Sequence, residues 1–152
     1  MFGLSKLFSS PPPPEPVSDD FMPWKDSYKL GIRSVDSDHR MLFDLVNSFE
    51  RSVRNRESVA RVNATIDALG NYVAEHFARE EKYLMAAKYP DVRAHMALHR
   101  DLKMDLEDFR RDYQQMPDDF DTTEFLNFLR DWLKDHILSE DQAYVPWVKG
   151  EV

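Results

Sequence analysis

The chain has 152 residues, 42% of them apolar and 32% charged, which suits a single globular domain with its own core. Its net charge of −8, without any strongly basic stretch, argues against nucleic acid or an anionic membrane as the main partner. The absence of cysteine excludes disulfides, thiolate metal ligands and cysteine nucleophiles, and it fits a reducing cytoplasm. No apolar run approaches the ~20 residues of a membrane span and no signal peptide is recognisable, so we expect a cytoplasmic protein.

Residues 1–20 are expected to form a flexible proline-rich tail, ahead of a helical domain over residues 21–152. The prolines at positions 11–14 and 16 are incompatible with a helix interior or a central strand and favour extended polyproline. We interpret residues 1–8 as a disordered leader, with an amphipathic anchor or a peptide for a protein partner as the alternatives.

The next segment, residues 21–33, contains aromatic side chains without helical periodicity. We expect an extended N-terminal arm that packs on the domain. Trp24 is its predicted anchor, because an indole ring buries a large apolar area.

Four stretches after the arm carry apolar side chains at alternating steps of three and four residues, the spacing of helices that each bury one face. The loops between them are short, which predicts antiparallel neighbours. The expected fold is therefore all-α, an up-down-up-down antiparallel four-helix bundle. The four stripes contain Val35, His39, Leu42, Val46, Phe49 and Val53, then Val62, Ile66, Leu69, Val73, His76, Glu80 and Tyr83, then Val92, His95, His99, Leu102, Leu106, Phe109 and Tyr113, and finally Leu126, Leu129, Leu133 and His136.

Local signals mark the ends of two of these helices. Ser34 or Asp36 is expected to cap the first, and Asp121 with Glu124 resembles a capping box at the start of the fourth. Pro146 is expected to end the fourth helix, because proline lacks the amide hydrogen that a helix interior needs.

Several polar side chains occupy stripe positions that otherwise hold Leu, Val, Ile or Phe. A buried imidazole or carboxylate is costly unless it is paired or bound to a cation. These residues fall at the start, end, start and end of successive antiparallel helices, so all of them are expected at one end of the bundle. They are His39, His76, Glu80, His95, His99 and His136.

A seventh candidate ligand is Asp141. It lies five residues after His136, about 500° around a regular helix, so it needs a π-bulge or a loosened last turn to face the same way. Glu140, at a spacing of four, would be the ligand in a regular helix, and helical geometry alone favours it.

The size and chemistry of this set indicate a site for two metal ions. Seven ligands are too many for one ion, and the set is too rich in histidine for Ca²⁺ or Mg²⁺. Imidazole together with carboxylate suits Fe, Zn, Mn or Ni. The count suits two ions that share bridging carboxylates.

The ligand pattern is similar to that of the hemerythrin family, specifically the single-domain bacteriohemerythrins. The likeness covers roughly residues 22–147 and extends to Trp24, Gly31 and Ile32 in the arm. Lys88 departs from the pattern, because the family usually has glycine before Tyr89-Pro90, but no ligand position is affected. The motifs are Asp36-x-x-His39, His76-Phe77-x-x-Glu80-Glu81, His95-x-x-x-His99 and His136-Ile137-x-x-x-Asp141.

The resemblance implies a non-haem di-iron centre (Fe²⁺/Fe³⁺) that binds O2 reversibly. By analogy, one iron is held by His95, His99 and His136, and the other by His39 and His76. Glu80 and Asp141 bridge both ions, with an oxo or hydroxo bridge as well, and the second iron keeps an open position for O2. The family also implies an apolar O2 pocket formed by Leu42, Phe77, Trp132, Leu133 and Ile137.

Oxygen storage, delivery or sensing is the favoured function, and we predict a binding protein rather than an enzyme. Five neutral imidazoles and two carboxylates give little anionic stabilisation to high-valent iron. The first alternative is a di-iron peroxidase, oxidase or nitric oxide scavenger, which carboxylate-rich Glu-x-x-His pairs would indicate, although the chain has none. The second is an O2-responsive signalling or localisation module that acts through the tail.

Other polar and aromatic residues near the ligands are expected to have structural roles. Asp38, Asp101 and Asp135 are predicted to be solvated, with the orientation of an imidazole as the alternative for one of them. Tyr144 is interpreted as a core or surface aromatic residue, with a contact to Asp141 as the alternative. Residues 79–82 are expected to form a solvated face apart from Glu80.

Overall fold

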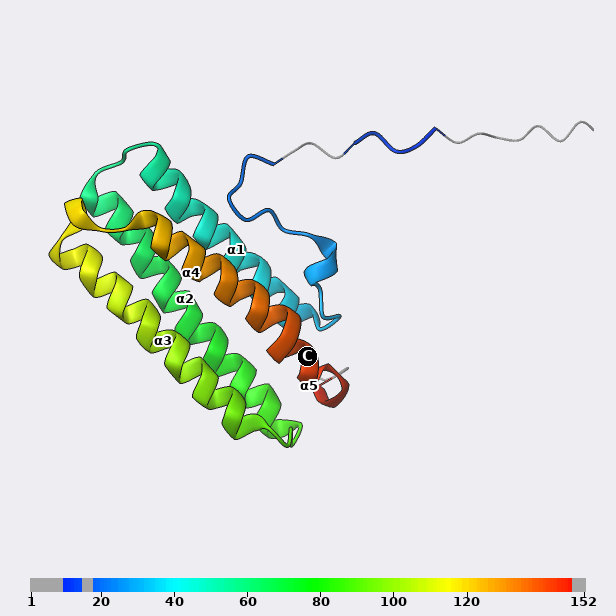
Figure 1. Cartoon of the computed structure of the whole chain (residues 1–152). Helices are drawn as coiled ribbons and strands as arrows, with labels where there is room; N and C mark the ends of the chain where they lie inside the picture. Colours follow the sequence, from blue (N-terminus) through cyan, green and yellow to red (C-terminus); the bar gives the residue numbers. More distant parts are fainter. Residues whose placement is uncertain (1–9, 15–17, 149–152) are drawn as a thin grey trace, which may run out of the picture.

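The computed structural model describes residues 10–14 and 18–148, and every regular element within these ranges is helical. Four long helices lie side by side and reverse direction in turn (Figure 1), which confirms the predicted all-α bundle. No described helix combines the length and the apolar character that crossing a membrane requires. The elements are η1 (Asp26–Tyr28), α1 (Arg33–Arg54), α2 (Val59–Ala86), α3 (Val92–Gln115), η2 (Pro117–Asp119), α4 (Thr122–Asp135), η3 (His136–Asp141) and α5 (Gln142–Val148).

The predicted stripes form the core, which consists of two apolar clusters. The larger cluster runs along the bundle and includes Phe49, Ile66 and Leu129, all fully buried. Phe125 and Trp132 are buried there as well, outside the predicted stripe of α4. The smaller cluster lies beyond the candidate ligands and contains Leu30, Ile32, Val35, Leu84, Tyr89, Tyr144 and Val148.

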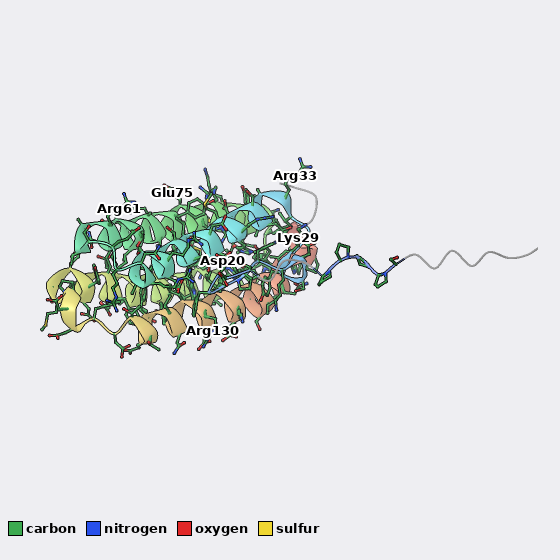
Figure 2. All side chains as sticks on the ribbon, turned by 90° about the horizontal axis from the view of Figure 1, so that it is seen from above. Asp20, Lys29, Arg33, Arg61, Glu75 and Arg130 are labelled. Atoms are coloured by element: carbon green, nitrogen blue, oxygen red, sulfur yellow. The ribbon has the colours of Figure 1, made fainter. Side chains whose placement is uncertain are left out.

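The N-terminal arm packs on the bundle as expected, although Trp24 shares the role of anchor. Met22 is buried, and its backbone N–H donates to Asn47 Oδ1 (2.7 Å) while its carbonyl accepts from Asn47 Nδ2 (2.9 Å). The half-buried Trp24 ring lies edge-on to Phe43, with centroids 5.2 Å apart. Asp20 forms an ion pair with Arg51 at 2.8 Å. Figure 2 shows Asp20 along the middle of the bundle, whereas Lys29 lies near one end.

The prediction that Ser34 or Asp36 caps α1 is wrong. The helix begins at Arg33, with Ile32 in the N-cap position and no side-chain cap bond. The Asp36 carboxylate accepts hydrogen bonds from the backbone N–H groups of Leu30 (2.7 Å) and Gly31 (3.1 Å), and therefore ties the arm to the first turn. Gly31 has a φ of +86°, which suits glycine.

The two predictions for the last helical region have opposite outcomes. Asp121 caps α4 as predicted, with its Oδ1 accepting from the Glu124 N–H at 2.9 Å. Pro146 does not end the helical run, because it lies inside α5. The backbone hydrogen bond that proline cannot donate is offset by the burial of Tyr144 and Val148 on either side.

The described part of the proline-rich segment, residues 10–14, is exposed and contains neither helix nor strand. Residues 1–8, for which a leader, an anchor or a partner peptide was considered, lie outside the described residues. The boundary of the tail at residue 20 stays a prediction.

Candidate metal centre

All seven predicted ligands meet at one end of the bundle, and each is at most 4% exposed. Helix α1 supplies His39, α2 supplies His76 and Glu80, α3 supplies His95 and His99, and η3 supplies His136 and Asp141. The paired ligands of α2 and of α3 are four residues apart, so they lie on one helix face, one turn from each other. Periodicity placed these residues inside the bundle, and the antiparallel order brings them to the same level.

The two carboxylates span two groups of imidazoles. Glu80 Oε1 lies 2.6 Å from His95 Nε2 and 3.1 Å from His99 Nε2, while its Oε2 lies 3.2 Å from His76 Nε2. Asp141 repeats the arrangement with His136 and His39: its Oδ1 lies 3.0 Å from His136 Nε2, and its Oδ2 lies 2.9 Å from His39 Nε2. One set therefore contains Glu80, His95, His99, His136 and Asp141, and the other contains His39, His76, Glu80 and Asp141.

The buried polar atoms of this centre fit metal ions better than they fit one another. His39 Nε2, His76 Nε2 and both oxygens of Asp141 have no acceptable hydrogen bond, although their neighbours are close. His99 Nε2 and His136 Nε2 also face each other at 3.2 Å. Buried polar atoms are almost always satisfied in native proteins. Close packing of imidazole nitrogens and carboxylate oxygens, several of them without a hydrogen bond, is the arrangement expected of residues that bind shared cations.

Asp141 reaches the centre because η3 is a π-helix, the distortion predicted for it. The wider turn places Asp141 on the same side as His136, five residues earlier, and leaves it fully buried. Glu140, which a regular helix would have favoured, is exposed.

The histidines and carboxylates shift one another's pKa values. Burial alone would raise the pKa of Glu80, but hydrogen bonding to the surrounding imidazoles holds it well below its ordinary value. Burial disfavours the imidazolium forms of His76 and His95, yet carboxylate contacts raise the pKa of each to about 9. Burial instead lowers the pKa of His99. Without metal, His76 and His95 therefore keep protons that metal binding displaces.

Several side chains support the ligands from outside, and sequence reasoning missed most of these contacts. Asp38, expected to be solvated, is only 13% exposed and accepts from His76 Nδ1 at 3.0 Å. Glu81, assigned to a solvated face, contacts His99 Nδ1 at 3.2 Å. Asp101 and Asp135 are exposed, as expected. The only signal in the sequence was the position of an acidic residue close to a candidate ligand. All four of these acidic residues share it, so it could not show which two contact an imidazole.

The position of Tyr144 was also not resolved by the sequence, which left a core or a surface location open. Its ring is fully buried, and its hydroxyl donates to Glu80 Oε2 at 3.1 Å rather than to Asp141. Burial and the nearby carboxylates strongly raise the pKa of Tyr144, so it stays a neutral donor. The hydroxyl therefore satisfies the oxygen of Glu80 that faces His76.

The residues predicted to line an apolar pocket are all buried in the larger cluster. Phe77 stacks on His99, with ring centroids 3.7 Å apart and an angle of 4° between the planes, and Trp132 lies edge-on to Phe77. Leu42, Leu133 and Ile137 are each 1% exposed. A hollow of about 410 Å³ between α3 and the end of α4 reaches Trp132 and His136. The structure thus buries these residues in the apolar core, while their role toward O2 stays a prediction.

The sequence of residues 30–148 matches the family described as the hemerythrin HHE cation binding domain. The chain belongs to the hemerythrin family. It is 31% identical to a bacteriohemerythrin of Clostridium acetobutylicum over 80% of this chain and 97% of that protein. It is 30% identical to a hemerythrin polypeptide of Sipunculus nudus, over 86% of this chain and 96% of that polypeptide.

The fold comparison agrees with the sequence comparison. A crystal structure of wild-type hemerythrin superposes with a TM-score of 0.78 at 27% identity, covering 86% of this chain and 99% of the other. A point mutant of hemerythrin gives a TM-score of 0.79 at 26% identity, with the same coverage of both chains. Both the sequence and the backbone therefore place this chain among the hemerythrins.

Proposed function

We propose that this hemerythrin-family protein binds O2 reversibly at a non-haem di-iron centre and serves oxygen storage, delivery or sensing. The observation that carries the proposal is the division of oxygens within each bridging carboxylate. One oxygen of Glu80 and one of Asp141 face the three-histidine set, and the other two face His39 and His76. Such an arrangement provides two adjacent cation positions with shared anionic ligands, and its mixture of imidazole and carboxylate suits iron.

In the proposed assignment, His95, His99 and His136 would hold one iron, His39 and His76 would hold the other, and Glu80 and Asp141 would contribute an oxygen to each. When bound, the iron pair supplies the two electrons that reversible binding of O2 requires. The set with His39 and His76 has one histidine fewer, so we assign the exogenous ligand to that side.

The surrounding residues make reversibility possible by keeping water and mobile protons away. Phe77 covers one face of the His99 ring, and Leu133 and Ile137 are buried in the same apolar cluster. Tyr144 holds its proton at Glu80 Oε2, and His76 holds its Nδ1 proton toward Asp38. A dry site without a freely exchanging acid slows the loss of reduced oxygen species.

Metal analysis and optical spectroscopy test the proposal together. Anaerobically loaded protein should contain two irons per chain and develop a near-ultraviolet and visible charge-transfer band in air that disappears when O2 is removed. Glu80→Ala should abolish the iron pair while the helix content of the chain is largely kept. A mononuclear protein, or one whose spectrum ignores O2, would contradict the proposal.

Enzymatic activity toward peroxide or nitric oxide is the second candidate. The hollow of about 410 Å³ that reaches His136 is the observation that favours it, because the hollow gives a small substrate such as peroxide a route from the surface to a member of the three-histidine set. Turnover of a substrate much faster than autoxidation of the iron pair would support this candidate over O2 binding.

A further inference from the structure

Asp38 sits at the centre of a hydrogen-bonded network between α1 and α2. Its Oδ1 accepts from Tyr72 Oη at 2.8 Å and from Arg79 Nη2 at 3.0 Å. Its Oδ2 accepts from Arg79 Nε at 3.0 Å and from His76 Nδ1 at 3.0 Å. The Arg79 guanidinium also lies over the Tyr72 ring, 5.4 Å from its centroid. Each carboxylate oxygen thus receives two donors, and these four hydrogen bonds together fix the orientation of the Asp38 side chain.

His99 also has a carboxylate next to its Nδ1 atom, but this carboxylate is held less firmly than Asp38. Glu81 contacts His99 Nδ1 at 3.2 Å, is 22% exposed, and forms no ion pair with a lysine or arginine within residues 18–148. Asp38 is less exposed, and its charge is compensated by the bidentate Arg79. His76 belongs to the set with two imidazoles, whereas His99 belongs to the set with three. The more firmly fixed carboxylate therefore supports the set that has fewer ligands.

We infer that Asp38, clamped by Arg79 and Tyr72, is the positioning residue for the iron site of His39 and His76. This inference rests on the proposed di-iron function. By accepting the Nδ1 proton, Asp38 selects the tautomer of His76 whose Nε2 lone pair points into the centre, and it fixes the rotation of the ring. With only one other imidazole in this set, a misdirected His76 leaves the ion mainly on bridging carboxylates.

Arg79 and Tyr72 hold the Asp38 carboxylate in a single orientation. A lone aspartate at the surface could turn toward water and release the imidazole. Two hydrogen bonds from a planar guanidinium fix both oxygens in one plane. Tyr72 then supports Arg79 through its ring and Asp38 through its hydroxyl.

The test is the substitution Asp38→Asn, with iron affinities measured by competition with a chelator. Asparagine has nearly the same volume, but it provides one acceptor oxygen where four donors need two, so the network cannot survive intact. We expect the two irons to respond differently: the affinity for one iron falls by about 10- to 100-fold, and the affinity for the other stays within about twofold. Tyr72→Phe, which keeps the ring beneath Arg79, should produce a smaller loss at the same iron.

A His76→Ala background shows which iron is affected. In that background, adding Asp38→Asn should not weaken the binding of the remaining iron further, because the imidazole that Asp38 orients has been removed. Glu81→Gln is the matched control and should weaken that remaining iron through His99. Far-ultraviolet circular dichroism and melting of the iron-free proteins report on folding separately.

Two results would overturn the inference while leaving the proposed function standing. These are an Asp38→Asn protein that keeps both affinities, and one that loses both by the same factor, as a general structural defect would cause. Failure of the wild-type chain to take up two irons would instead remove the proposed function and the inference with it.

Discussion

Lys88 has a positive φ of 57°, just after the end of α2. Its N–H donates to the Met85 carbonyl at 3.2 Å and the Tyr89 N–H donates to the Leu84 carbonyl at 3.0 Å, so the left-handed residue completes the helix end. A residue with a side chain loses about 1–2 kcal/mol when its backbone is left-handed. Glycine avoids this strain, but its more flexible unfolded chain offsets part of the gain. Lys88→Gly should therefore raise the free energy of unfolding by up to about 1 kcal/mol.

Urea denaturation of the iron-free protein measures this effect. Lys103→Gly is the control, because Lys103 is exposed in the interior of α3, and there glycine should lower stability by about 1 kcal/mol. Loss of stability at both positions would show that the turn does not strain Lys88.

The ligand histidines also make the stability of the iron-free protein depend on pH. His76 and His95 have pKa values raised from the ordinary 6.5 to about 9, and the pKa of His39 is raised as well. A raised pKa in the folded state stabilises the protein fully below pH 6.5, and this contribution is lost as the pH rises through about 9. We expect the free energy of unfolding of chelator-stripped protein to fall by a few kcal/mol, as an order of magnitude, across this window.

In the proposed centre iron takes the place of these protons, so the stability of the loaded protein should depend much less on pH in that range. Urea titrations of both forms at pH 6.5 and pH 9 make the comparison. A stripped protein whose stability is flat or rises would contradict the pairing of the imidazolium groups with Asp38, Glu80 and Asp141.

At the scale of single elements, the π-helical η3 decides which of two adjacent acids faces the centre. Asp141 is fully buried against His39 and His136, and Glu140 is exposed. Asp141→Asn should lower the iron content below two per chain, because one bridging oxygen becomes an amide nitrogen. Glu140→Gln makes the same chemical change one residue earlier and should leave iron content and spectrum unchanged. Loss of iron in Glu140→Gln but not in Asp141→Asn would mean that η3 relaxes to a regular helix in the loaded protein.

The elements also show what the sequence could and could not predict. Periodicity and chain direction depend only on spacing along the chain, so the bundle, the meeting of the seven ligands and the distorted turn before Asp141 were predictable. Which acid lies against which imidazole depends on the rotation of one helix relative to its neighbour. The contacts of Asp38 with His76 and of Tyr144 with Glu80 are of this kind. Pro146 was misassigned because its local preference is outweighed by the burial of its neighbours.

In the whole molecule, the centre separates the two apolar clusters along three parts of the chain. On α1, Val35 of the smaller cluster and Leu42 of the larger one flank His39. On α2, Phe77 and Leu84 flank Glu80 in the same way, and Ile137 and Tyr144 flank Asp141. The smaller cluster is therefore joined to the main core through seven buried polar side chains. Metal bound only to the folded state stabilises that junction by mass action.

Removal of iron should consequently loosen the molecule at one end rather than throughout. The smaller cluster holds Leu30 and Ile32 at the end of the arm, the end of α2 and α5, and it is a separate apolar cluster from the one on the other side of the centre. Hydrogen exchange with mass spectrometry on loaded and stripped protein should show lost protection in peptides around Ile32, Leu84 and Val148. Peptides around Phe49, Ile66 and Phe125, in the far half of the larger cluster, should keep theirs. The control is Asp141→Asn, which lacks one proposed bridging carboxylate, so chelator should change its hydrogen exchange much less. A uniform loss of protection in the wild-type protein would show that the two clusters unfold as one unit.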